Sequence, residues 1–213
     1  MKKRVLVLLI LVLAFSALIG SGCANVSADA AASGTVSLVN FESDSDVVVS
    51  DVMTGFDMIA HIAQNVELSD RINFWKLPGV KAVRTSDATY RSFCVPLRVN
   101  DKYCPYLDIC CATEETDDGY RITSVYSVQL VREYRGASKQ FSGTILVLLR
   151  DDNAIEYSVN GDFVKNGKTT MSGGIGLDAG LNEPCVVTGE VSVKHRVRNY
   201  QYYYSHKTVA CER

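Results

Sequence analysis

The pattern of apolar and polar positions divides the chain into three parts. Three basic residues precede an almost uninterrupted apolar run over residues 5–19. Residues 31–50 are mostly polar, whereas from Tyr90 onward apolar residues recur in short segments rich in Val, Ile, Tyr and Thr. The pattern predicts an export signal over residues 1–30, a polar linker or edge strand over 31–50, and one β-rich globular domain over 51–213.

The apolar run near the start is shorter than the roughly twenty residues that a membrane span needs. Basic residues before it and small residues after it are typical of an export signal. Gly20–Cys23 resembles a bacterial lipoprotein cleavage box, in which Cys23 would carry the lipid, although Gly20 stands where a large aliphatic residue is usual. Residues 28–30, Ala-Asp-Ala, fit ordinary cleavage instead. Both alternatives place the mature protein outside the cytosol, secreted or attached to the cell envelope.

One helix is expected near the start of the globular part. Apolar residues recur at three- and four-residue steps over residues 52–63, a spacing typical of an amphipathic helix. Ser50 or Asp51 is available to cap its start, whereas Gly55 would weaken it from within. His61 falls off the apolar stripe, so we expect a surface histidine there.

Short β-forming segments separated by turn residues predict antiparallel strands. The expected strands are Tyr90–Val99, Tyr103–Ala112, Arg121–Tyr134, Phe141–Arg150, Ala154–Val164 and Val186–Val197. Their gaps are too short for the crossover that parallel neighbours need. Residues 144–149 are apolar on both faces, which indicates a central strand, and the glycine-rich residues 171–181 are expected to form a connection. We therefore predict a mainly β fold, an antiparallel meander or sandwich with one N-terminal helix.

Composition and charge bear on which partners the protein is expected to have, and they do not change the predicted fold. The chain has 22 basic and 24 acidic residues and a formal net charge of −2. The charges are nearly balanced, and neither half of the chain concentrates one sign. They give no reason to expect a nucleic-acid partner. No second apolar run has bilayer length, so membrane contact is expected only through a lipid on Cys23.

Cysteine usage is the strongest compositional signal. Cys23 falls in the signal region, and six others remain: Cys94, Cys104, Cys110, Cys111, Cys185 and Cys211. An even number in an exported chain predicts three disulfides, with free buried cysteines as the alternative. The spacing lacks the paired cysteines and nearby histidine of a zinc site, so no metal or cofactor is expected.

The last part of the chain predicts a hairpin closed by a disulfide. A turn over residues 197–199 would bring Cys185 opposite Cys211, and facing strand residues have the spacing that a disulfide needs. Adjacent residues on a strand point to opposite faces, so Cys110 and Cys111 are not expected to join each other. The remaining cysteines would pair among themselves, Cys94 and Cys104 each with either member of that adjacent pair.

The same hairpin provides the main hypothesis about binding. One of its faces would carry aromatic and cationic side chains: Lys194, Arg196, Tyr200, Tyr202, Tyr204 and His206. The hairpin register would also place His206 opposite Glu190. Tyrosines interleaved with cations form a platform suited to sugar rings or anionic wall polymers. The alternative is the ordinary outer face of a sheet, since the same residue types are good solvent-exposed strand formers.

Catalytic motifs are weak. The chain has three histidines, His61, His195 and His206. No serine or cysteine lies in a recognisable nucleophile motif. Glycoside hydrolysis requires two carboxylates, and Asp108 with Glu114 or Glu115 is an example of such a pair in the chain. The alternative is that these are ordinary exposed acids of strands and turns. We therefore expect a non-enzymatic binding or structural module of the bacterial cell envelope, whose partner is another envelope component or a polysaccharide. A small secreted hydrolase is the alternative.

Overall fold

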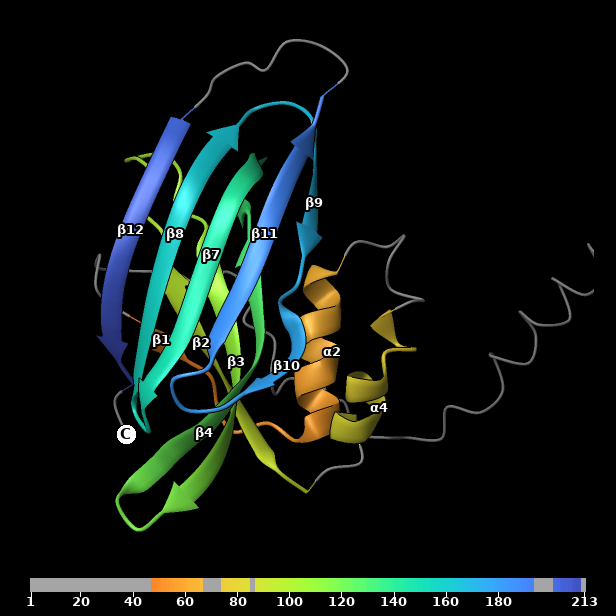
Figure 1. Cartoon of the computed structure of the whole chain (residues 1–213), viewed down its shortest axis with the longest axis vertical. Coiled ribbons are helices and arrows are strands. Elements are labelled where there is room, and N and C mark those ends of the chain that lie inside the picture. The colour runs from red at the N-terminus through yellow and green to blue at the C-terminus, as the bar shows by residue number, and fades with distance from the viewer. Residues whose placement is uncertain (1–46, 67–73, 85–86, 194–200, 212–213) are drawn as a thin grey trace, which may run out of the picture. The chain divides into compact units, whose positions relative to one another are not determined.

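Two five-stranded antiparallel sheets make up most of the described chain (Figure 1). The computed structural model describes residues 47–66, 74–84, 87–193 and 201–211, all within one compact unit, Gly34–Arg213. The first sheet has the order β1 (Val48–Val49), β2 (Thr89–Pro96), β3 (Tyr106–Thr116), β4 (Gly119–Val131), β10 (Ile175–Ala179). The second has the order β12 (Gln201–Ala210), β8 (Ala154–Val164), β7 (Gln140–Asp151), β11 (Pro184–Ser192), β9 (Lys168–Ser172). A small ribbon joins β5 (Glu133–Tyr134) to β6 (Ala137–Ser138).

The two sheets enclose one apolar core, which makes the fold a β-sandwich. Because successive side chains of a strand point to opposite faces, alternate residues of β3 and β7 enter this core, such as Leu107, Ile109, Ile145 and Val147. Phe163 of β8 is fully buried among them. Each such side chain contributes roughly 1.5–3 kcal/mol by leaving water. The prediction of a mainly β, antiparallel fold is confirmed.

Helix α2 (Gly55–Asn65) covers the outer face of the first sheet. Thr54 caps it: the Thr54 hydroxyl accepts a hydrogen bond from the Asp57 N–H at 3.2 Å, and the Asp57 carboxylate accepts one from the Thr54 N–H at 3.3 Å. Such a reciprocal capping box satisfies two N–H groups that the first turn leaves unpaired. The helix was expected near these residues, but a cap at Ser50 or Asp51 was wrong because Thr54 caps the helix and forms the box with Asp57.

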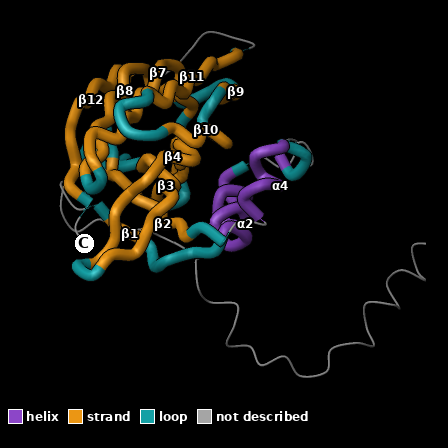
Figure 2. The backbone as a smooth tube through the Cα atoms, turned by 60° about the horizontal axis from the view of Figure 1, so that its bottom comes forward, coloured by secondary structure: helices purple, strands orange, loops and turns teal. Residues whose placement is uncertain are grey.

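A second, shorter helix, α4 (Pro78–Arg84), packs beside α2 (Figure 2). The sequence analysis did not predict it. Its close approach explains Gly55, where an added Cβ would lie 2.0 Å from the carbonyl oxygen of Val83. The glycine therefore permits helix contact and does not weaken the interior of α2, since it is the first helical residue. Neither described helix has the length and apolar character that a membrane crossing requires.

The strand predictions are confirmed in part. Strand β8 has the predicted bounds, and β7, which contains the doubly apolar segment, lies in the middle of its sheet. The connection expected over residues 171–181 was wrong, because β9 ends and β10 runs within it. Between them, Gly173 and Gly174 adopt φ of 80° and 89°, a region that glycine enters without steric cost. The glycines thus form the tight passage by which the chain leaves the second sheet for the first.

The predicted hairpin near the C-terminus was wrong, because β11 and β12 do not pair. Strand β12 pairs with β8, whereas β11 pairs with β7 and β9. Cys185 therefore faces Val147 and not Cys211, and Glu190 faces Thr170 and not His206. The reason is that β7 and β9 occupy both edges of β11, which leaves no edge of β11 for β12. Residues 197–199, on which the predicted turn depended, lie outside the described residues.

Candidate functional site

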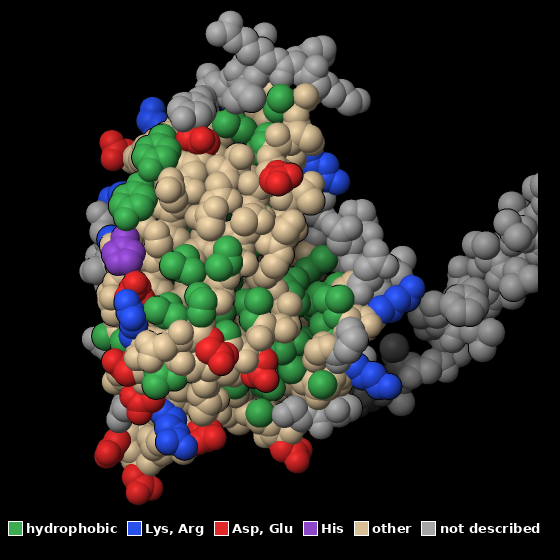
Figure 3. Space-filling view, in the orientation of Figure 1, with side chains coloured by type: hydrophobic (Ala, Val, Ile, Leu, Met, Phe, Trp, Pro, Cys, Tyr) green, Lys and Arg blue, Asp and Glu red, His purple; other side chains and the backbone are tan. Residues whose placement is uncertain are grey.

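The outer face of the second sheet carries two of the predicted tyrosines. Tyr202 and Tyr204 are 57% and 59% exposed, and they alternate along β12 with Tyr203 and Ser205, which face inward. The predicted alternation of this strand is therefore confirmed. Figure 3 shows this face of the molecule, whose upper part consists mainly of uncharged polar side chains and backbone. Lys194, Arg196, Tyr200 and His195 lie outside the described residues.

The strand beside the tyrosines supplies hydrogen-bonding groups. Across the β12–β8 ladder, Tyr202 faces Asp162 and Tyr204 faces Asn160. The Tyr202 hydroxyl donates to Asn160 Oδ1 at 3.0 Å, a contact that holds one ring over the sheet. His206 Nε2 lies 3.6 Å from a carboxylate oxygen of Glu156. The face thus combines exposed rings with amide, carboxylate and imidazole groups.

The carboxylates proposed for hydrolysis do not come together. Asp108 is fully buried beneath α2. Glu114 lies toward the far end of β3 and pairs with Arg121 at 2.5 Å, and the neighbouring Glu115 pairs with Arg91 at 3.1 Å. Both glutamates are exposed. These residues therefore do not form the facing pair of acids that a glycosidase needs.

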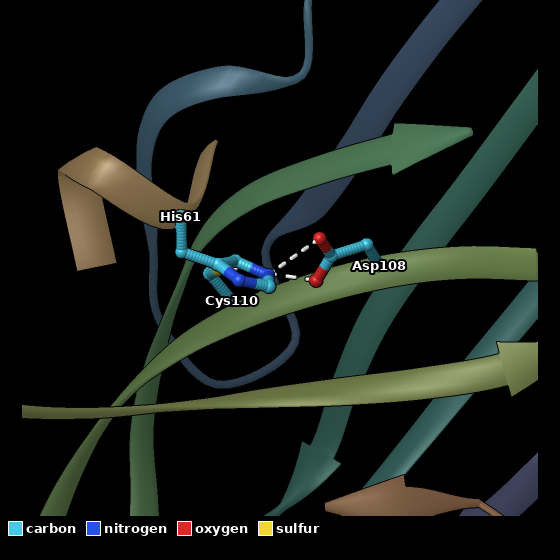
Figure 4. Close-up of side chains that lie close together, drawn as sticks. All are labelled: His61, Asp108 and Cys110. Atoms are coloured by element: carbon cyan, nitrogen blue, oxygen red, sulfur yellow. Dashed lines mark hydrogen bonds and ion pairs between the residues drawn. The ribbon is translucent and has the colours of Figure 1, made fainter. Parts of the chain in front are cut away.

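Asp108 is the centre of a buried polar cluster between α2 and the first sheet (Figure 4). His61 Nε2 donates to Asp108 Oδ2 at 2.7 Å, and Asn65 Nδ2 donates to the same oxygen at 3.2 Å. The Ser92 hydroxyl and the Cys110 thiol donate to Asp108 Oδ1 at 2.5 Å and 3.7 Å. The prediction of a surface histidine at position 61 was wrong, since only 6% of His61 is exposed.

The strand pattern explains how these side chains meet. Asp108 and Cys110 alternate on β3 with residues of the sandwich core, so they project toward the helix. Strand β2 places Ser92 directly opposite Cys110, and Cys94 opposite Asp108. His61 reaches them from α2, a sequence separation of 47 residues. The one signal in the sequence was an acidic residue within an otherwise apolar strand.

The buried cysteines lie on both sides of the first sheet, some toward the helix and others in the sandwich core. All six that fall within the described residues are thiols. Cys110 belongs to the helix-side cluster and Cys111 to the sandwich core, where Cys185 and Cys211 also lie. Burial raises the pKa of Cys185 to about 11 and that of Cys94 to about 12. These thiols are therefore protonated at neutral pH and are poor nucleophiles.

A pocket of about 480 Å³ opens beside the buried cluster. Its walls come from the end of α2 and from β4, β9, β10 and β11, with both cationic and apolar side chains, among them Arg132, Lys168, Val128, Met171 and Val187. Asn65, which bonds Asp108, and Gln129, which faces Asp108 across the β3–β4 ladder, also line it. Its volume falls within the range of small-molecule sites.

Comparison with known proteins assigns no family to this arrangement. No family model matches the chain, and neither does any curated protein or solved structure. The function must be inferred from the tyrosine face of the second sheet, the buried cluster around Asp108 and the pocket beside it.

Proposed function

We propose that this protein is an exported, non-enzymatic binding module of the bacterial cell envelope that holds a polysaccharide on the outer face of its second sheet. The observation that carries the proposal is the exposure of two tyrosine rings, Tyr202 and Tyr204, on the same face of one strand. An aromatic ring offers a broad apolar surface with a polar tip, which suits the C–H face of a sugar and its neighbouring hydroxyl groups.

The shape of the face favours a polymer over a small molecule. Two residues on one face of a strand are separated by about 7 Å along it, so the two rings form a row. Asn160 and Asp162 on β8 run parallel to that row, and they offer hydrogen-bond partners to sugar hydroxyls. A small ligand would instead require a concave site that encloses most of its surface.

Export would also change the state of the cysteines. An oxidising compartment favours disulfides, and we propose that the mature domain is stapled there by oxidation of cysteines in its sandwich core. Cys111, Cys185 and Cys211 share the sandwich core, and the pKa of Cys111 is raised mainly by burial and further by the nearby Cys211 and Cys185. A bridge from Cys111 on β3 to either of the other two would join the first sheet to the second across the core. Mass spectrometry of the mature protein before and after reduction would count the bridges, locate the cleavage site and detect an acyl chain on Cys23.

Binding to insoluble cell-wall polysaccharide tests the proposed function. We expect the mature protein to sediment with the polysaccharide, and the double variant Tyr202→Ala with Tyr204→Ala to lose at least about 90% of that binding, since the packing of sugars depends on the two rings. The thermal stability of the double variant should change little, because both side chains are exposed.

Phe56→Ala is the matched control. Phe56 is an aromatic residue of similar exposure, 54%, but it lies on α2 and not on the tyrosine face. Its removal should leave binding unchanged. Wild-type binding by the folded double tyrosine variant, or equal loss in the Phe56 variant, would refute the proposal.

A further inference from the structure

We propose that His61, Asp108 and Cys110 form a binding site for a divalent transition metal ion, Zn²⁺, between helix α2 and the first sheet. One ligand atom from each residue lies within 4.8 Å of the other two, and all three residues are buried. Figure 4 shows the three side chains converging from the helix and from strand β3. This site is distinct from the tyrosine face and does not depend on polysaccharide binding.

The chemistry of the three donors suits zinc. Imidazole nitrogen, carboxylate oxygen and cysteine sulfur are the donor types that zinc accepts in proteins, at about 2.0–2.3 Å. Two ligand atoms on a tetrahedral ion at these distances are separated by roughly 3.3–3.7 Å. Cys110 Sγ lies 3.7 Å from Asp108 Oδ1, and His61 Nε2 lies 2.7 Å from Asp108 Oδ2. A modest movement of the histidine ring away from the carboxylate would therefore admit the ion.

The cluster buries a carboxylate whose charge a cation would compensate further, beyond the hydrogen bonds from Asn65 and Ser92. A carboxylate enclosed between a helix and a sheet is costly unless an opposite charge or several hydrogen bonds compensate for it. Asp108 is 0% exposed in an interface otherwise built from side chains such as Ile59 and Ile62. A bound cation would neutralise this carboxylate and the Cys110 thiolate together.

Neighbouring side chains are placed to orient the carboxylate. Ser92 and Asn65 donate to different oxygens of Asp108, as outer hydrogen bonds commonly do around a metal ligand. On binding, the His61 ring would carry its proton on Nδ1, which frees the Nε2 lone pair for the metal. The Cys110 thiol would release its proton to solvent, and the sulfur would take the metal in its place. The ion would then join α2 to β3 in place of the hydrogen bond from His61 to Asp108, while the bond from Asn65 remains.

The test uses the full chain, reduced and freed of metal by a chelator. Added Zn²⁺ should bind at about one ion per chain, and it should raise the Tm of the wild-type protein by mass action. Co²⁺ as a probe should produce the near-ultraviolet charge-transfer band of a cobalt–thiolate bond. Cys110→Ser should abolish that band, and His61→Gln should weaken metal affinity at least about tenfold.

Cys104→Ser is the control variant, because Cys104 is half-buried and is not one of the three converging ligands. It should retain the band and the affinity. The proposal is overturned if wild-type protein shows neither a zinc-dependent rise in Tm nor a cobalt–thiolate band, or if Cys110→Ser keeps the band. Both wild-type measurements stand even where a cluster variant fails to fold.

Discussion

Nε2 of His61 on helix α2 lies 2.7 Å from Oδ2 of Asp108 on strand β3, although the two residues are 47 positions apart in the chain. Their side chains are 7% and 1% exposed, so the contact is shielded from water. Because it joins a helix to a strand of the sheet that the helix covers, it fixes where α2 sits on the first sheet.

Removal of the imidazole should destabilise the metal-free protein strongly. His61→Ala leaves the Asp108 carboxylate buried without the imidazole that contacts its Oδ2, and breaking one side of a buried pair costs about 3–5 kcal/mol. Urea unfolding followed by circular dichroism would measure this loss. His206→Ala, at a histidine that is half-exposed on the tyrosine face, should change the free energy of unfolding by no more than about 0.5 kcal/mol. A loss below about 1 kcal/mol for His61→Ala would show that the contact does not hold the helix.

Two glycines in the helical region should respond oppositely to alanine. Gly55→Ala would place a methyl group 2.0 Å from the Val83 carbonyl oxygen, so we expect a loss of about 1–3 kcal/mol from overpacking. At Gly79 in α4, the nearest atom to an added Cβ is 3.6 Å away. Gly79→Ala should therefore be neutral or stabilising by about 0.5–1 kcal/mol. Thermal unfolding of both variants would check this, and equal effects would exclude close helix packing as the reason for Gly55.

The reduced protein should lose stability in alkaline solution. Burial raises the pKa of Cys185 from 9.0 to about 11 and that of Cys211 from 9.0 to about 12. The folded state therefore holds these protons more tightly than the unfolded state. The stabilisation is complete below pH 9 and is lost as the pH rises toward 11 and 12. Urea midpoints between pH 8 and pH 10.5 should fall, and the fall should be smaller in Cys185→Ala. An unchanged midpoint in wild-type protein over this range would contradict the prediction.

Local periodicity predicted several elements well. Strand β8 and the central place of β7 followed from runs of β-branched and apolar residues, and the exposed positions of Tyr202 and Tyr204 followed from alternation along one strand. These properties depend only on near neighbours in the chain, since a strand sends successive side chains to opposite faces whatever its partner is.

The candidate metal cluster could not be predicted in the same way. His61 was expected at the surface because it lies off the main apolar stripe of its helix, but the first sheet covers that side as well. The cysteine spacing gave no reason to predict a zinc site. The proposed ligands come from two elements, α2 and β3, and not from one cysteine motif. Only the packing of α2 across β3 brings His61 to Asp108 and Cys110.

The sequence by itself therefore determined the antiparallel β class, the main strands, and which side chains of β12 face solvent. The tertiary structure alone decided that β12 pairs with β8, that Cys185 does not face Cys211, and that a polar cluster is enclosed beneath α2. The physical reason is that side-chain alternation is a local property of the backbone. The choice of strand partner and of the surface that covers a face depends on contacts between residues far apart in the chain.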